Sequence, residues 1–403
     1  MPRGQAPTPS HLTAAALTNP RRLPPAAVSS TPPPDAWVTV EVGHRVPLYF
    51  LGGGGDGDDS GKNGPAPPPV ALLLHGNGFH GLAMAPLAPA LLAAGFFVVS
   101  LDFRGHGACG IGWRPGGAMP PPDTSHATLA RDVATVIRAR GWGGRCAILG
   151  HSLGGGVAAL VSLACPGLAS ALFLYEPVLP APATTGWGRA AAGDADPAWG
   201  SQALIDQALA RPDAFSSLDA ARASLASARG LRQLCPEAAA ALADAYFWQG
   251  TGGREGGEHG TSPVFHPRCH PLVEAAVYAG GYPGAQGEPW GWGRPEDRGD
   301  APAADRDENT HVFWRLAGVN EPVAVARGRV GDGPHASLAH AAAEIAAQCP
   351  KGELVEFLSL RHLGPLEDPT AVGAGAAAFF VRAGAGRRGG AGESRAGSPA
   401  SRL

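Results

Sequence analysis

A serine stands between two glycines in the pentad Gly150-His151-Ser152-Leu153-Gly154. The apolar run 146–149 precedes the pentad and an apolar, helix-like stretch follows it, so the serine is expected at a strand-to-helix turn. Such a turn exposes a hydroxyl at the edge of a sheet, while the glycines let strand and helix approach closely. We therefore predict that Ser152 is a nucleophile for acyl transfer.

A serine nucleophile needs a base that removes its proton, and His362 is the candidate. The chain has 14 histidines, but His362 is the one that stands two residues past the end of the predicted strand 353–360. In a parallel sheet, the loops after the carboxyl ends of the strands carry the reactive groups. We therefore expect His362 to accept the proton of Ser152, and activity to fall at acid pH as His362 becomes protonated.

Two carboxylates are candidates for orienting the imidazole of His362. Asp332 follows the predicted strand 322–326, which places it between the serine and the histidine in the order Ser, Asp, His. Glu176 ends the predicted strand 171–175, and a carboxylate at that position could also reach the histidine. The chain order favours Asp332 slightly, and Glu176 is the alternative.

The oxyanion that develops during acyl transfer needs hydrogen-bond donors, which backbone N–H groups can supply. We predict that Leu153, directly after the serine, and Asn77, in the loop after the predicted strand 70–74, are these donors. His151 is expected to be only the variable residue of the pentad. The polar residues after the predicted strand 96–101 are expected to hold their loop rather than to react: Asp102, Arg104 and His106.

Composition and spacing argue against several other classes of function. The chain of 403 residues has a net charge of -3 and no basic face for nucleic acid. Its six cysteines are spread out without a Cys-x-x-Cys pair, which indicates a reducing compartment. The segment His266-Pro267-Arg268-Cys269-His270 has no second ligand cluster at metal spacing, so no metal site is predicted.

The order of the predicted elements indicates the fold class. Strands and helices alternate over residues 70–177 and again over 322–381, which predicts an α/β protein with a mostly parallel, doubly wound sheet. A hairpin of strands at 37–42 and 46–51 comes before them. Between residues 178 and 320 the alternation stops, and helix-like segments separated by glycine-rich loops predict an inserted helical cap.

These patterns divide the chain into a core, a cap and two tails. We predict a core of residues 36–177 and 321–383, with the cap at 178–320 between its two parts. Residues 1–35 are rich in proline and alanine, which predicts a disordered tail or, alternatively, an organelle transit segment. Residues 384–403 are expected to be a second disordered tail. No membrane-spanning segment is predicted, so the expected location is the cytoplasm, or an organelle if the first tail is a transit segment.

In their order along the chain, these motifs resemble those of the α/β-hydrolase superfamily, and within it the AB hydrolase-1 type of serine hydrolase with a helical cap. The matching motifs are His75-Gly76-Asn77-Gly78, Asp102-x-Arg104-Gly105-His106-Gly107, Gly150-His151-Ser152-Leu153-Gly154-Gly155 and Arg361-His362-Leu363-Gly364-Pro365. The resemblance covers roughly residues 70–177 and 321–381. It implies a sheet of about eight strands, no cofactor, and a pocket between the sheet and the cap.

The chain departs from the family pattern in places. Cys109 stands where the family usually has a serine, and Asp332 lies further from Gly328 than the usual spacing. Leu174-Tyr175-Glu176 resembles the relatives that place their acid after the sixth strand, which weakens the case for Asp332. Ser152 at the strand-to-helix turn, called the elbow below, argues against epoxide hydrolases and haloalkane dehalogenases, because those relatives use an aspartate nucleophile there.

The expected function is that of a cofactor-free serine hydrolase. It would cleave an ester, lactone or related acyl bond of a mainly apolar small molecule through an acyl-enzyme on Ser152. The same residues could serve an acyltransferase, or a hydrolase or lyase of carbon-carbon bonds, because the cap sets specificity. A non-catalytic small-molecule receptor is an alternative from another class, since fold alone does not determine function. We expect no nucleic-acid partner and no stable membrane insertion, and no motif indicates the oligomeric state.

Overall fold

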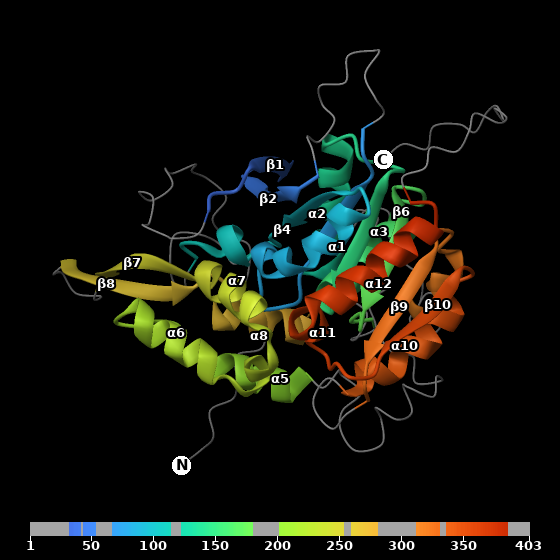
Figure 1. The fold of residues 1–403 in the computed structure, drawn as a ribbon. Coiled ribbons are helices and arrows are strands. Elements are labelled where there is room, and N and C mark those ends of the chain that lie inside the picture. The colour runs from blue at the N-terminus through green and yellow to red at the C-terminus, as the bar shows by residue number, and fades with distance from the viewer. Residues whose placement is uncertain are drawn as a thin grey trace, which may run out of the picture.

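The computed structural model describes residues 32–41, 43–53, 67–113, 122–179, 201–253, 259–280, 312–330 and 336–385. Within them, a sheet of eight strands has the order β1-β2-β4-β3-β5-β6-β9-β10 (Figure 1). Its strands are β1 (Ala36–Glu41), β2 (His44–Gly52), β3 (Val70–Leu74), β4 (Phe97–Leu101), β5 (Cys146–His151), β6 (Ala169–Tyr175), β9 (Val323–Gly328) and β10 (Gly352–Phe357).

The direction of the strands confirms the predicted fold class. The predicted hairpin is present, because β1 pairs with β2 antiparallel, and β2 pairs with β4 antiparallel. Every other neighbouring pair in the sheet is parallel. The central strands β3 and β4 are buried along their whole length, which is why their sequences are continuous apolar runs. The chain is therefore an α/β protein with a mostly parallel, doubly wound sheet.

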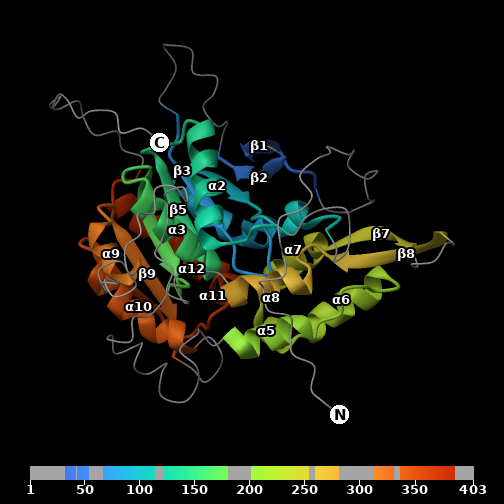
Figure 2. The same ribbon diagram turned by 180° about the vertical axis from the view of Figure 1, so that it is seen from behind.

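Helices cover both faces of this sheet (Figures 1 and 2). One face carries α1 (Ala88–Ala93) and α12 (Pro369–Arg382), and the other carries α2 (His126–Ala139), α3 (Leu153–Ala164) and α10 (Ala336–Gln348). Successive residues of β3 point to opposite faces: Leu72 belongs to the apolar cluster with Leu129 and Val157, and Leu73 to the cluster with Leu91 and Phe380. These two layers of apolar contacts fix the sheet, and so fix the ends of its strands.

Helix starts follow local sequence signals. Asp368 caps the start of α12, because it accepts a hydrogen bond from the backbone N–H of Ala371 at 2.8 Å, and Pro369 occupies the first turn. Asp123 and Thr124 precede α2 and are residues that often cap helices, but Ser125 is its N-cap. Asp123 instead accepts from the backbone N–H of Ser125 at 3.0 Å, so it supports the cap from outside the helix.

Most of the segment between β6 and β9 lies at one end of the sheet and forms an insertion, whereas residues 312–318 pack with α3 and α10 on one face of the sheet (Figures 1 and 2). The described elements of the segment are α5 (Ser201–Leu209), α6 (Leu218–Ser227), η4 (Arg229–Gln233), α7 (Pro236–Tyr246), β7 (Phe247–Gly253), β8 (His259–Pro267), α8 (Pro271–Gly280), α9 (Val312–Arg315) and η8 (Leu316–Gly318). Helices were predicted here, and α5 and α7 match two of them. The antiparallel pair β7 and β8 was not predicted, so the insertion is not purely helical.

Contacts between buried groups join this insertion to the core. Nε2 of His80, just before the 3-10 helix η2 (Gly81–Leu87), lies 3.0 Å from the carbonyl oxygen of Leu242 in α7. Ala83 of η2 belongs to an apolar cluster with insertion residues of α6 and α7. The backbone N–H of Cys235 donates to the carbonyl of Leu366 at 3.0 Å. The insertion therefore packs beside the loop that follows β3.

Several predictions fall outside the described residues and stay predictions. They concern the N-terminal tail up to residue 31, Asp332, and the C-terminal tail from residue 386. The boundaries of core and cap at residues 36–177, 178–320 and 321–383 also stay predictions. Among the helices that the structure describes, none is both long and apolar enough to cross a membrane.

Candidate active site

Ser152 sits on a tight turn between β5 and α3, as the pentad predicts. Its backbone has φ 54° and ψ -114°, which an L-residue adopts only under strain. A Cβ on Gly150 would lie 2.4 Å from the carbonyl oxygen of Gly154. A Cβ on Gly154 would lie 2.3 Å from the carbonyl oxygen of Leu74. Both pentad glycines are therefore required, because strand and helix approach each other too closely for any side chain.

His362 is brought to this serine from the far end of the chain. It lies in the loop between β10 and α11 (Gly364–Glu367), and its Nε2 is 3.2 Å from Oγ of Ser152. This distance suits a hydrogen bond from the serine hydroxyl to the imidazole. The structure thus places the sequence-predicted nucleophile and base in direct contact.

Glu176 is the carboxylate that contacts this histidine. It follows the last residue of β6, is 1% exposed, and its Oε2 lies 2.8 Å from Nδ1 of His362. Its Oε1 accepts a hydrogen bond from the backbone N–H of Gly328 at 2.8 Å. An ionised carboxylate only accepts, so Nδ1 carries the proton and the lone pair of Nε2 faces Ser152. Of the two carboxylates predicted from the sequence, Glu176 reaches the histidine, and Asp332 lies outside the described residues.

The backbone at Ser152 and Glu176 shares one unusual property. Among the residues that the structure describes, they are the only non-glycine residues with positive φ, at 54° and 41°. A positive φ costs about 1–3 kcal/mol for such residues and persists where the surrounding structure enforces it. Strain of this kind is concentrated at functional sites, so it marks both positions independently of their contacts with His362.

The surroundings of His362 set its protonation state. Burial lowers its pKa from 6.5 to about 4, because the charged imidazolium is poorly solvated there. The carboxylate of Glu176 acts in the opposite direction, since a neighbouring negative charge favours the protonated ring. Near neutral pH the imidazole is therefore neutral and able to accept a proton.

The two predicted oxyanion donors, Leu153 and Asn77, come from different elements. Leu153 is the first residue of α3, so its backbone N–H has no partner within the helix and stands at the positive end of the helix dipole. Asn77 is in the loop after β3, and its side chain is held from two directions. Its Nδ2 donates to the carbonyl of Glu274 in α8 at 3.0 Å, and its Oδ1 lies 3.1 Å from Nε2 of His106. Core and insertion together fix this loop.

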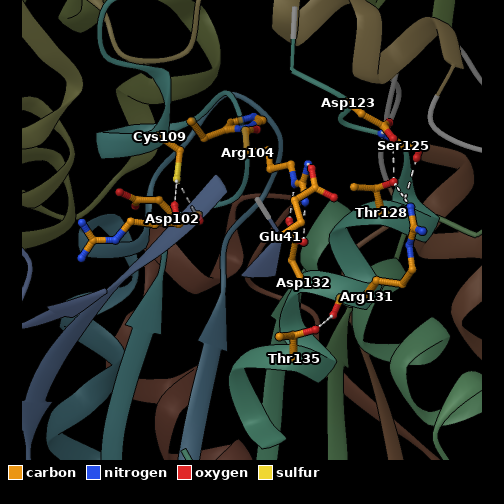
Figure 3. Close-up of polar contacts among 12 residues, drawn as sticks. Glu41, Asp102, Arg104, Cys109, Asp123, Ser125, Thr128, Arg131, Asp132 and Thr135 are labelled. Carbon is orange, nitrogen blue, oxygen red and sulfur yellow. Dashed lines mark hydrogen bonds and ion pairs between the residues drawn. The ribbon is translucent and has the colours of Figure 1, made fainter. Parts of the chain in front are cut away.

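The polar residues after β4 hold their own loop, as the sequence predicts. Asp102 accepts hydrogen bonds from the backbone N–H groups of Gly81 and Ala108, both at 2.7 Å. Arg104 is buried and binds both carboxylate oxygens of Asp132, and it also binds Glu41 (Figure 3). These groups have their partners in the scaffold, and none of these bonds leads to Ser152.

Other buried histidines near the site have structural partners. Nδ1 of His75 is 2.7 Å from the carbonyl of Gly76, and the backbone N–H of Phe103 donates to its Nε2 at 3.1 Å. Burial lowers the pKa of His75 well below 6.5 and that of His106 to about 4. His75 thereby links the loop after β3 to the loop after β4 as a neutral ring.

His151 and Tyr175 contact the loop 358–363, which carries His362 and is called the base loop below. Sequence reasoning missed both contacts. Nε2 of His151 lies 2.8 Å from the carbonyl oxygen of His362, and the hydroxyl of Tyr175 donates to the carbonyl of Arg361 at 2.8 Å. His151 was expected to be only a variable residue, which this contact corrects. The signal that could have found them is their position, directly before Ser152 and Glu176.

The histidines of the segment 266–270 point to Asp213 in the insertion. Nδ1 of His266 is 2.7 Å from the carbonyl oxygen of Asp213, and Nε2 of His270 is 3.4 Å from its carboxylate. Within the described ranges, no group of three or more His, Cys, Asp or Glu residues is arranged to hold a metal ion.

Comparison with known proteins gives the same fold. The family described as serine aminopeptidase, S33, matches residues 65–226. The solved structure of E-2-(acetamidomethylene)succinate hydrolase is 17% identical, has a TM-score of 0.56, and the match covers 86% of this chain and 98% of that one. A peroxisomal α/β-hydrolase of Saccharomyces cerevisiae is 15% identical, with a TM-score of 0.56 and coverage of 84% of this chain and 81% of that chain. A hydrolase of Pseudomonas aeruginosa is 21% identical, with a TM-score of 0.51 and coverage of 86% and 97%.

The sheet order, the serine elbow and these similarities agree with one another. The family match spans the segment from before β3 into the insertion, and so includes the loop after β3 and the elbow at Ser152. The structural matches extend over most of the chain. This chain therefore has the α/β-hydrolase fold, and its residues 65–226 match a family of that fold.

Proposed function

We propose that this protein is a serine hydrolase that cleaves an ester, lactone or related acyl bond through an acyl-enzyme on Ser152. The observation that carries the proposal is the continuous chain of contacts from Oγ of Ser152 to His362 at 3.2 Å, and from His362 to Glu176 at 2.8 Å. Acyl transfer to a serine requires a nucleophile, a base and an orienting acid that contact one another in this order.

In the first half of the reaction, Oγ of Ser152 attacks the carbonyl carbon while Nε2 of His362 takes the hydroxyl proton. The ring then gives this proton to the leaving alkoxide as the tetrahedral intermediate collapses to the acyl-enzyme. In the second half, His362 removes a proton from water, and the resulting attack releases the acid and restores Ser152. Glu176 keeps Nδ1 protonated throughout and stabilises the imidazolium that forms in each half.

Two backbone N–H groups would stabilise the oxyanion of the tetrahedral intermediate, those of Leu153 and Asn77. The position of Leu153 at the start of α3, a helix of 12 residues, supports its role, because the helix dipole favours negative charge there. The bonds that hold the Asn77 side chain support the second role, since a donor must be fixed before the charge develops.

A mainly apolar small molecule is the substrate class that we propose. The support is the apolar cluster between the loop after β3 and the insertion, in which Phe79, Phe215 and Phe265 are only partly buried. Aromatic side chains at such a junction suit an apolar acyl or alcohol group. The insertion would then act as the cap over the site.

Acyltransferases and carbon-carbon hydrolases or lyases could use the same residues. The acyl-enzyme would pass to an alcohol or thiol in the first case, and the broken bond would join two carbons in the second. No contact in the described structure favours either one. The strained, fully partnered arrangement of Ser152, His362 and Glu176 argues against a non-catalytic receptor, because binding alone gives no reason to maintain the strain.

Covalent labelling with a fluorophosphonate probe tests the proposal. We expect wild type to be labelled, and Ser152→Ala and His362→Ala not to be. Ser162→Ala is the matched control, because Ser162 lies on the same helix α3 but is fully buried. Equal labelling of wild type and Ser152→Ala would refute the assignment. A series of p-nitrophenyl esters of increasing acyl length then tests the apolar preference, which predicts that kcat/KM rises with chain length.

A further inference from the structure

The two residues that precede Ser152 and Glu176 form a matched pair. β5 and β6 are parallel neighbours, and His151 at the end of β5 lies opposite Tyr175 at the end of β6. Both side chains are buried, with exposures of 1% and 0%. Each strand therefore ends in a dipeptide, His151-Ser152 or Tyr175-Glu176, and the positive φ of its second residue reverses the chain there.

The first residue of each dipeptide binds the backbone of the base loop. The hydroxyl of Tyr175 donates to the carbonyl of Arg361, and Nε2 of His151 lies at hydrogen-bond distance from the next carbonyl, that of His362. Both distances are 2.8 Å. A carbonyl only accepts, so Nε2 of His151 carries a proton. Consecutive backbone carbonyls are thus held by residues on neighbouring strands.

The packing around these two side chains leaves them little room to move. A Cβ on Gly364, just after the base, would lie 2.0 Å from the hydroxyl oxygen of Tyr175. A Cβ on Gly76, in the loop after β3, would lie 3.0 Å from Nδ1 of His151. The ring centroids of His151 and His362 are 5.1 Å apart. His151 is therefore enclosed between the base loop and the loop that carries Asn77.

We propose that His151 and Tyr175 are positioning residues for His362. They bind two consecutive backbone carbonyls of the base loop, those of Arg361 and His362. Ser152 and Glu176 contact the two nitrogens of the His362 imidazole. The two dipeptides thus fix the base at its main chain and at its side chain from the same pair of strands. This inference rests on the proposed function, because positioning matters only if His362 transfers a proton.

The expected loss of kcat follows from how steeply the rate of proton transfer depends on the position of the base. Displacing a catalytic group by about 1 Å can cost about 100-fold in rate. Loss of one of two backbone bonds should allow a smaller displacement, so we expect kcat to fall about tenfold in Tyr175→Phe and in His151→Phe. KM should not change, because neither side chain is proposed to touch substrate.

Kinetics of the full-length protein on one p-nitrophenyl ester test the proposal. The variants are Tyr175→Phe, His151→Phe, the double variant, and His151→Gln, whose side-chain amide can still donate near the position of Nε2. We expect His151→Gln to recover most of the kcat that His151→Phe loses. The double variant should lose less than the product of the single losses, because both residues hold the same loop. Tyr49→Phe is the matched control, since it removes a buried hydroxyl that donates to Asp102 in the scaffold at 2.8 Å, and its kcat should match wild type.

A merely structural role would give a different pattern. It would lower the melting temperature and leave the kcat of the folded fraction within about twofold of wild type, and this result in Tyr175→Phe would overturn the proposal. Equal losses in His151→Gln and His151→Phe would remove His151 from it. If His151→Phe does not fold, Tyr175→Phe decides, because it deletes a single oxygen atom. Failure of the proposed function is recognised separately, since wild type would then show no labelling that depends on Ser152.

Discussion

The carboxylate of Glu176 accepts a hydrogen bond from the backbone N–H of Gly328 at 2.8 Å. This bond ties the end of β6 to the end of β9, the strand whose exit loop leads to Asp332. A Cβ on Gly328 would lie 2.6 Å from the carbonyl oxygen of Leu360, so the three loops meet without space for a side chain. Glu176 is thus bound both to His362 and to β9, the strand that precedes Asp332, the other candidate for the acid.

The first prediction distinguishes Glu176 from Asp332 as the acid that orients His362. Glu176→Gln should lower kcat about 1,000-fold or more, because an amide can hold His362 in the wrong tautomer and cannot stabilise the imidazolium. Asp332→Asn should keep kcat close to wild type. Steady-state kinetics on one ester measure both variants. Should Asp332→Asn lose activity while Glu176→Gln keeps it, Asp332 is the acid and our assignment is wrong.

The second prediction concerns the pH dependence of activity. Burial lowers the pKa of His362 to about 4, so the neutral base persists below its ordinary pKa of 6.5. Activity should therefore be full at neutral pH and fall as pH drops through the pKa of His362, with the midpoint of kcat/KM below 6.5. Glu176→Gln should move the midpoint of its residual activity further to acid, because the lost carboxylate had favoured the protonated ring.

Circular dichroism at each pH supplies the control for that experiment. Acid unfolding would also abolish activity, because buried neutral histidines such as His75 and His106 are protonated more readily in the unfolded chain. The midpoint of activity counts only where the protein is still folded. A midpoint at or above 6.5 in folded protein would contradict the effect of burial on His362.

Much of the fold was predictable because its signals are local. The apolar runs at β3 and β4, the pentad at Ser152 and the Asp368-Pro369 start of α12 each report a structure formed by adjacent residues. His362 was found through the strand order, since its place after the last strand fixes the edge of the sheet at which it stands. The two residues of the Ser152–His362 contact were therefore both accessible to sequence reasoning.

The remaining parts depend on features that short patterns do not encode. The choice between Glu176 and Asp332 depends on the backbone reversal at Glu176, whose N–H donates to the carbonyl of the distant residue Ala326 at 2.8 Å. The contact of His151 with the base loop joins residues 211 positions apart. β7 was missed because its sequence, FWQGTGG, has glycines where alternating strand residues would be expected.

The third prediction concerns the ion pair of Arg104 and Asp132 (Figure 3). Both side chains are buried, with exposures of 3% and 5%. Arg104→Met leaves Asp132 without its partner, and should lower the free energy of unfolding by about 3–5 kcal/mol. Arg382→Ala is the control, because Arg382 pairs with Glu353 in solvent, with exposures of 59% and 44%. It should cost less than about 1 kcal/mol. Urea denaturation measures both, and similar losses would mean that burial of the pair has no effect.

The fourth prediction tests the close approach of strand and helix at the elbow. In Gly154→Ala the new Cβ would lie 2.3 Å from the carbonyl oxygen of Leu74, and backbone atoms cannot move aside as a flexible side chain can. α3 must then shift away from β3 and take Ser152 with it. We expect a loss of about 1–3 kcal/mol in the free energy of unfolding and a fall in kcat of about 100-fold.

Gly230→Ala is the matched control for this elbow variant. Gly230 lies in η4, and a Cβ there would have no atom within 4 Å, so stability and kcat should stay near wild type. Chemical denaturation and ester kinetics are measured on the same preparations of both variants. If Gly154→Ala keeps wild-type kcat, the position of Ser152 does not depend on this contact. The turn between β5 and α3 then accommodates a larger residue than its geometry indicates.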